Sequence, residues 1–400
     1  MERPEKNVKN MLISAKDTSE LMLDLAYAAV FFNDRDIVEE VIDLEKNMSE
    51  IIHDLQILCI LAGRSPEDAQ QVSGILHIAM AIEKIGDEAS EIARVVTKDL
   101  GIPEELLLDL RHAEEVIGRA MVGEDSPLQN IPLRELNLAQ DTGMWIIAIR
   151  RDKDWIIGPG GDDILYRGDV LIVQGAEEGL ESLSNLARSL LPRSITIPES
   201  KTPLPGLEQA VDLVVELKDL AEIAVNLAYS SVLFQDKALA VEVSGMEEQS
   251  DNMQRELEKW VLTTAREYPR PENLRGLIQL ARASEAIVDA ARGITSLIEK
   301  EKPLHPVITV ALQETLEVVM QEMIGAGSRI AGMSLKQFLK TTKLGLSPLA
   351  IQRGRRWFCR PRPDFILKGE DLLIVTGPPE SEDKLQQLCQ GKGNKIKKKH

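Results

Sequence analysis

The most constraining feature of this sequence is an internal repeat with a constant offset of 202 residues. The repeated motifs are Leu25–Tyr27 with Leu227–Tyr229, Glu83–Asp87 with Glu285–Asp289, Trp155 with Trp357, and Asp169–Gly175 with Asp371–Gly377. Because the repeat keeps one register from helical through strand segments, each half is a complete unit and the chain is a tandem duplication. A position kept in both halves is therefore the better candidate for chemistry that the unit needs.

The composition places limits on the function. At 400 residues the chain is too long for a single compact core, and its net charge of −18 argues against nucleic-acid binding. None of the three cysteines is kept in the repeat, which favours apolar side chains in a reducing compartment. We find no signal-peptide core and no run of about 20 apolar residues, so we expect a cytoplasmic protein.

The first part of each half has helical periodicity. The third segment of the first half shows it best, in an apolar stripe of Ile75, Ile78, Ile82, Ile85, Ala89, Ile92 and Val96. Breaks at Asn33–Asp34 and Gly63–Pro66 predict three long helices, with Ser65 as an N-cap. A shorter helix is predicted over Glu104–Met121, and its repeat over Val307–Met323.

At Gly123 the periodicity changes to short β-type runs, Trp145–Ile149, Trp155–Ile157 and Val170–Val173, followed by a helix over Glu177–Leu190. The expected fold class is therefore α+β multidomain, a tandem repeat of an antiparallel helical bundle and a small α+β domain. The predicted domains are helical regions 1–122 and 206–324, α+β regions 123–191 and 325–390, a proline-rich linker 192–205 and a basic tail 391–400.

The helical region resembles the PhoU domain. The resemblance rests on the motif Ala81–Ala89 with Ile92–Ala93. The second copy, Ala283–Asp289, is a weaker match because it lacks the glycine found at Gly86. In PhoU-like domains, carboxylates spaced four residues apart belong to a motif that holds iron, zinc or magnesium. The resemblance therefore implies a divalent or ferric metal site at two carboxylate pairs, Glu83 with Asp87 and Glu285 with Asp289.

Residues four apart project from one face of a helix, and a hard cation needs further oxygen ligands from a second helix. Glu39 and Asp43, also four apart, could supply them in the first half, although the repeat replaces them by Val241 and Gly245. The alternative is that the carboxylates are exposed and pair with basic residues such as Lys84 or Arg94.

The α+β region resembles the TrkA-C domain, or C-terminal RCK domain, of potassium-channel and Trk-type transport subunits. Its marks are Ser126–Leu128, Leu133–Leu136, Ile146–Arg150 and Leu165–Gly175, with Leu367–Gly377 in the second copy. Together the two resemblances imply a regulator of potassium or other cation transport. They imply a membrane transporter or channel subunit as partner, peripheral attachment to the membrane through it, and a homo-oligomer or intrachain pseudo-dimer.

Arginine residues are the second candidate for binding chemistry. Arg151 is kept as Arg353, and Arg150, Arg355 and Arg356 lie beside them. The planar guanidinium group donates two parallel hydrogen bonds to phosphate. In related regulatory domains this segment resembles a pocket for cyclic di-AMP or another small anion, so the resemblance implies a ligand of that class. The alternative is a basic loop that is solvated or paired to the acidic helices.

No catalytic arrangement is kept in both halves. The histidines have no histidine counterparts, and the loop Gly158–Gly161 corresponds to Arg360–Pro363, whose prolines lack the backbone donors of a phosphate cradle. A Gly-x-Gly-x-x-Gly motif after a strand is also absent. We therefore expect a non-catalytic regulator of cation transport that senses a small anion. The alternatives are a metal-binding regulator of phosphate uptake and a ligand-free assembly scaffold.

Overall fold

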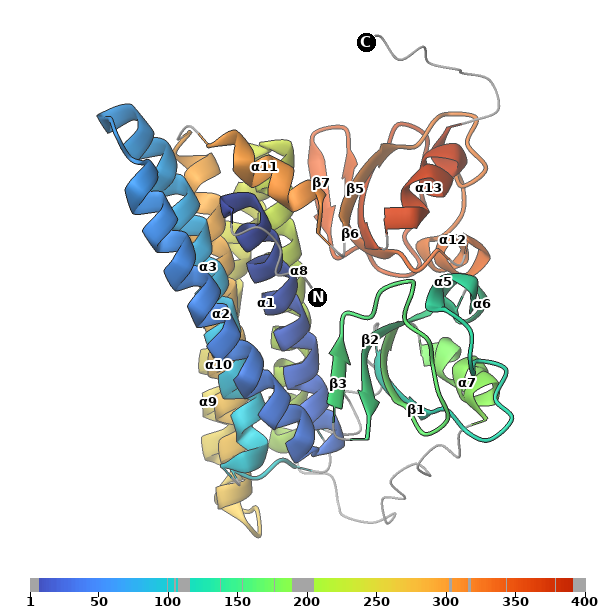
Figure 1. Ribbon diagram of the computed structural model, residues 1–400. Coiled ribbons are helices and arrows are strands. Elements are labelled where there is room, and N and C mark those ends of the chain that lie inside the picture. The colour runs from blue at the N-terminus through green and yellow to red at the C-terminus, as the bar shows by residue number, and fades with distance from the viewer. Residues whose placement is uncertain are drawn as a thin grey trace. The chain divides into compact units, whose positions relative to one another are not determined.

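A computed structural model describes residues 7–98, 100–103, 106, 116–136, 138–152, 154–175, 177–188, 205–301, 304–315, 318–342, 344–377 and 379–390. The chain forms two compact units, and each draws on both halves of the sequence (Figure 1). One unit contains Met1–Ile117 and Pro192–Thr315, whose described residues are mainly helical. The other contains Gly118–Leu191 and Leu316–His400, whose described residues form the α+β modules. The predicted tail, and the predicted linker apart from Pro205, lie outside the described residues.

The first half of the helical unit has the three helices expected from the sequence, α1 (Val8–Phe32), α2 (Arg35–Ala62) and α3 (Pro66–Thr97). Ser65 caps α3 by accepting a hydrogen bond of 3.1 Å from the Asp68 amide, as predicted. The predicted apolar stripe of α3 is buried from Ile75 to Val96. Burial of this stripe is what places the polar side chains of α3 at the edges of the bundle.

The second half repeats this arrangement with α8 (Pro205–Phe234), α9 (Lys237–Thr264), the 3₁₀ turn η2 (Pro271–Leu274), α10 (Arg275–Glu299) and α11 (Pro306–Gln313). Asp34 and Asp236, which the repeat keeps, are the N-caps of α2 and α9. Their side chains accept from the amides two residues later at 2.9 and 2.8 Å. In the described part of the chain, no helix is both long and apolar enough to cross a membrane.

The first α+β module contains a four-stranded sheet in the order β1-β4-β2-β3. Its elements are β1 (Val116–Met121), α5 (Leu133–Leu136), α6 (Leu138–Thr142), β2 (Met144–Arg151), β3 (Asp154–Ile157), β4 (Val170–Gly175) and α7 (Glu177–Ala187). Strand β2 is antiparallel to both β3 and β4. The three predicted β runs and the closing helix are thus confirmed.

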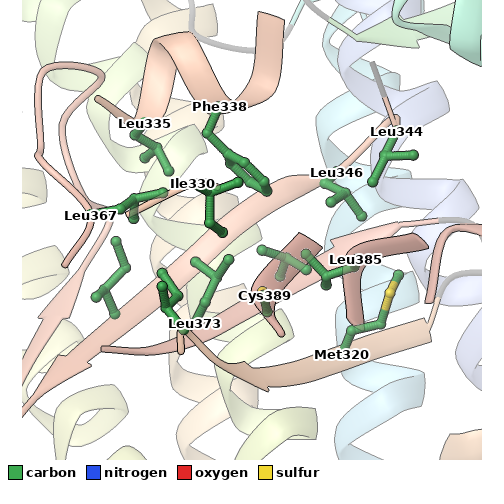
Figure 2. Packing of buried hydrophobic residues seen from close by; sticks show 13 residues of the cluster. Met320, Ile330, Leu335, Phe338, Leu344, Leu346, Leu367, Leu373, Leu385 and Cys389 are labelled. Carbon is green, nitrogen blue, oxygen red and sulfur yellow. The ribbon is translucent and has the colours of Figure 1, made fainter. Parts of the chain in front are cut away.

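The second module repeats the topology as β5-β8-β6-β7. Its elements are β5 (Val318–Met323), α12 (Leu335–Thr342), β6 (Ser347–Arg353), β7 (Arg356–Cys359), β8 (Leu372–Gly377), η3 (Pro379–Ser381) and α13 (Glu382–Cys389). Figure 2 shows its core, in which Phe338, Met320, Leu373 and Leu385 are packed around Cys389. Burial raises the pKa of Cys389 to about 12, which suits the apolar role expected of it.

The predicted helices over Glu104–Met121 and Val307–Met323 are wrong in their last six residues. These residues are the strands β1 and β5, each at an edge of its sheet. At Gly118 in β1, a Cβ atom would lie 1.9 Å from Leu180 Cδ2, so only glycine leaves room for that leucine. In the second module, Met320 corresponds to Gly118 and Glu382 corresponds to Leu180. Each module therefore has one large apolar side chain at this pair of positions.

Candidate functional site

Arg151 and Asp169 form a two-bond ion pair inside the first module. Arg151 Nε and Nη2 donate to Asp169 Oδ1 and Oδ2 at 2.9 and 2.8 Å, and Nη2 also donates to the carbonyl oxygen of Ile164 at 2.8 Å. Asp169 is 1% exposed and accepts from the Tyr166 amide at 2.8 Å. This bidentate geometry is strong, and the bonds to Asp169 raise the pKa of Arg151 above its usual value.

The second module contains the same arrangement. Arg353 Nε and Nη2 donate to the two carboxylate oxygens of Asp371, both at 2.7 Å, and Nη2 also donates to the carbonyl oxygen of Ile366 at 2.8 Å. The Lys368 amide donates to Asp371 at 2.8 Å. The arginine and the aspartate that both halves share therefore form an ion pair with each other in each module. Both guanidinium groups stabilise the turn before the last strand of their module, and a ligand-binding role for them stays a prediction.

The other two predicted arginines of the second module, Arg355 and Arg356, are exposed at the turn between β6 and β7. The guanidinium carbon of Arg356 lies 4.9 Å from the ring centroid of Phe358. That ring lies 5.1 Å from the ring of Phe365, which is 4.7 Å from the guanidinium carbon of Arg353. We call Arg356, Phe358, Phe365 and Arg353 the arginine–phenylalanine ladder. It combines positive charge for a phosphate with flat apolar surface for a base.

The first module lacks this ladder. Its predicted residue Arg150 lies over the Trp155 ring at 5.8 Å. The repeat gives Asp154 in place of Arg356 and Ile156 in place of Phe358. The corresponding hairpins of the two modules therefore differ in charge, and the second is the more positive.

In the first half of the helical unit, the carboxylates of Glu83 and Asp87 lie on one face of α3, as predicted. Burial raises the pKa of both groups, and a neighbouring charge adds to it, Asp87 for Glu83 and Glu45 for Asp87. The acidic side chain of α2 that acts on Asp87 is therefore Glu45. Arg94 Nη2 and Ser90 Oγ already donate to Glu45, at 2.9 and 2.6 Å.

The proposed α2 ligands Glu39 and Asp43 have no such relation to Asp87 in the described contacts. Asp43 accepts from Lys46 at 2.7 Å on the exposed side of α2. In the part of the chain that the structure describes, no three His, Cys, Asp or Glu side chains converge to hold a metal ion. Metal binding by these residues stays a prediction.

In the second half, the carboxylates of Glu285 and Asp289 meet a cation of the same chain. Lys84 Nζ of α3 donates to Asp289 Oδ2 at 2.8 Å. Burial raises the pKa of Glu285, and the charges of Asp251, Asp289 and Glu247 add to it while Lys84 lowers it. The expected metal ligands of this half therefore already have a positive neighbour.

The sequence analysis missed a buried polar cluster between α1 and α8. Lys16 Nζ donates to Glu20 at 2.6 Å and lies 5.2 Å from the Tyr229 ring, and Lys218 Nζ donates to Glu222 at 2.7 Å and lies 5.4 Å from the Tyr27 ring. Lys16 and Lys218 are 2% and 5% exposed. Each lysine thus pairs with a glutamate of its own half and covers a tyrosine of the other. The repeat could have revealed it, because Lys-Asp-x-x-Glu recurs at an offset of 202.

Two family models match the chain, each in both halves. The PhoU domain matches residues 12–96 and 214–298, and the TrkA-C domain matches residues 117–188 and 319–390. The fold and these matches define a protein composed of regulatory domains in tandem. More specifically, the chain belongs to the PhoU and TrkA-C families as a duplicated fusion of the two domains.

Known proteins resemble separate parts of the chain. Probable potassium channel protein 2 of Methanocaldococcus jannaschii is 38% identical over 68 residues, which are 17% of this chain and 20% of that protein, so this chain spans about a fifth of that relative. PhoU from Pseudomonas aeruginosa is 16% identical, with a TM-score of 0.40, over 73% of this chain and 93% of that one. The RCK_C domain dimer of S. agalactiae BusR in complex with c-di-AMP is 25% identical, with a TM-score of 0.18, over 19% of this chain and 94% of that one.

Proposed function

We propose that the protein regulates potassium or other cation transport by sensing a small anionic ligand, of the nucleotide class, through its TrkA-C modules. The observation that carries the proposal is the arginine–phenylalanine ladder of the second module. A phosphate needs directed positive charge, and a base gains from a flat aromatic neighbour. Arg353 is fixed by Asp371, so it orients the ladder, while Arg355 and Arg356 are the exposed groups that meet the ligand.

The charge of the chain favours this location. The protein carries a formal charge of −18, so most of its surface repels an anion. Between residues 353 and 362 the sequence instead places five arginines, Arg353, Arg355, Arg356, Arg360 and Arg362. This local concentration of positive charge would attract an anion to the second module.

The arrangement of the modules supports a role in signal transfer. Both TrkA-C modules belong to one compact unit, so their pairing would occur within the chain. The helical unit would then dock on a membrane cation transporter or channel subunit from the cytoplasmic side. The similarity of 68 residues of the chain to part of a potassium channel protein supports potassium as the transported ion. The likeness to a domain bound to c-di-AMP makes that nucleotide the first ligand to test.

Isothermal titration calorimetry of the full chain tests the proposal, with cyclic di-AMP, ATP, AMP and inorganic phosphate as separate titrants. We expect one nucleotide to bind, and Arg355→Ala/Arg356→Ala to weaken it by about tenfold or more, since a charge-assisted hydrogen bond contributes about 1.5–3 kcal/mol. The matched control is Arg134→Ala/Arg167→Ala, which removes two exposed arginines from the first module. Equal loss in both variants would reduce the effect to net charge, and no binding by the native protein would leave an assembly scaffold.

A further inference from the structure

We propose that in the second half of the helical unit the ammonium group of Lys84 takes the place of a metal cation beside Glu285 and Asp289, so that Asp289 forms a metal-independent contact between the halves. The contact is Lys84 Nζ to Asp289 Oδ2, 2.8 Å across the α3–α10 interface. The inference is independent of ligand sensing by the TrkA-C modules.

The register of the two helices fixes this contact. Seven residues before Lys84, His77 Nε2 lies 3.1 Å from the Oγ of Ser296, which is seven residues after Asp289. The two helices thus run antiparallel, and matched positions recur every two turns on both. The packing of α3 on α10 therefore places Lys84 beside Asp289, where the two side chains are 42% and 45% exposed.

The repeat shows that the contact from α3 to α10 has no equivalent from α10 to α3. The counterpart of Lys84 on α10 is Ala286, whose uncharged side chain cannot form the equivalent ion pair with α3. Accordingly, no lysine or arginine nitrogen lies within 4 Å of the Glu83 or Asp87 carboxylates in the described ranges. The duplicated carboxylate pairs have diverged. The other half supplies a lysine to the second pair, whereas the first pair has no such basic neighbour among the described residues.

Two other acids near Glu285 also have basic neighbours within the chain. Arg292 Nη1 lies 3.1 Å from Glu247, and Arg255 Nη2 lies 3.8 Å from Asp251. A metal ion at Asp289 would have to displace Lys84 or remain beside it, and like charges at such distances repel. Removing the ammonium group should therefore open the second pair to a metal, whereas the native residue should close it.

Zinc titration calorimetry on the full chain tests the inference. Lys84→Ala places the residue of the other half at this position, and we expect it to gain Zn²⁺ binding at least about tenfold tighter than any shown by the native protein. That gain should disappear in Lys84→Ala/Asp289→Asn. The matched control Ala286→Lys adds an ammonium group toward the first pair and should gain no Zn²⁺ site.

Two results would overturn the inference. One is native protein that binds Zn²⁺ and loses this binding on Asp289→Asn, since the metal would then tolerate Lys84. The other is a folded Lys84→Ala variant, checked by circular dichroism, that gains no Asp289-dependent binding. Thermal unfolding with and without EDTA gives a second measurement. The melting temperature of the native protein should not depend on Asp289-bound metal, and that of Lys84→Ala should rise with Zn²⁺.

Discussion

The hydroxyl oxygens of Tyr27 and Ser284 lie 2.9 Å apart in a buried hydrogen bond that joins the first half of the chain to the second. The repeat has no equivalent of this bond at the corresponding positions. The counterpart of Ser284 is Ile82, which has no polar atom to offer Tyr229. Tyr229 Oη, although close to Ser19, has no partner in hydrogen-bonding geometry within the described residues. Tyr27 Oη therefore has a hydrogen-bond partner, whereas Tyr229 Oη has none in the described part of the chain.

This asymmetry predicts different costs for the same substitution in the two halves. Tyr27→Phe should lower the free energy of unfolding by about 1 kcal/mol, the net value of a typical hydrogen bond. Tyr229→Phe, its matched control, removes a hydroxyl that forms no bond and should be neutral or slightly stabilising. Urea denaturation of both variants measures the difference. Equal losses would mean that Tyr229 Oη has a partner of the same strength.

The ion pair of Arg353 and Asp371 predicts a stability effect in the second module. Asp371→Asn should lower the free energy of unfolding by about 2–4 kcal/mol, because it leaves Arg353 beside a neutral amide. The value lies below that of a fully buried pair because the Arg353 side chain is 32% exposed. Asp364→Asn removes the same charge from an exposed site of the module and should change stability by less than about 0.5 kcal/mol. A small effect at Asp371 would mean that the ion pair contributes little to the stability of the module.

Much of the fold follows from local sequence patterns. The apolar stripe of α3 and the cap at Ser65 are set by periodicity and hydrogen bonding within a few residues, so they were predictable. The strands β1 and β5 were not. Each forms an outer strand of its sheet. A six-residue segment such as Val318–Met323, in which Gln321 and Glu322 interrupt the apolar residues without strict alternation, suits a strand or a helix equally well.

The candidate site shows the same division. The repeat identified Arg151 and Asp169 separately as kept positions, but pairing across 18 residues depends on the turn that brings β4 beside β2. The contact between Lys84 and Asp289 agrees with the alternative that the carboxylates pair with basic residues such as Lys84. The sequence did not show which carboxylate Lys84 would meet, because the repeat does not keep Lys84 and the contact joins the two halves. Chemistry that arose after the duplication can be found only from the packing of the two halves.

The close approach of β1 and α7 predicts that the first module tolerates no side chain at residue 118. Gly118→Ala should lower the free energy of unfolding by about 1–3 kcal/mol, because its Cβ would overlap Leu180 Cδ2. Shortening the leucine in Gly118→Ala/Leu180→Ala should recover part of the loss. Gly74→Ala in α3 is the control, since its Cβ would meet nothing within 4 Å and should stabilise the helix by about 0.5–1 kcal/mol. Chemical denaturation distinguishes overlap from a general effect of added methyl groups, which would make both substitutions alike.

The carboxylate pair of α3 predicts a pH dependence of stability. Burial, followed by the charge of Asp87, raises the pKa of Glu83 in the folded protein above its ordinary value of 4.5. The folded state then holds the proton more tightly than the unfolded chain, so stability is lost as the pH rises through the folded pKa. Glu83→Gln cannot ionise, so it should gain stability relative to the native protein between pH 4 and pH 7. Urea denaturation at both pH values in EDTA measures this gain, with the exposed Glu50→Gln as control. A native protein that Zn²⁺ stabilises at pH 7, beside a Glu83→Gln variant that it does not, would instead make Glu83 a metal ligand.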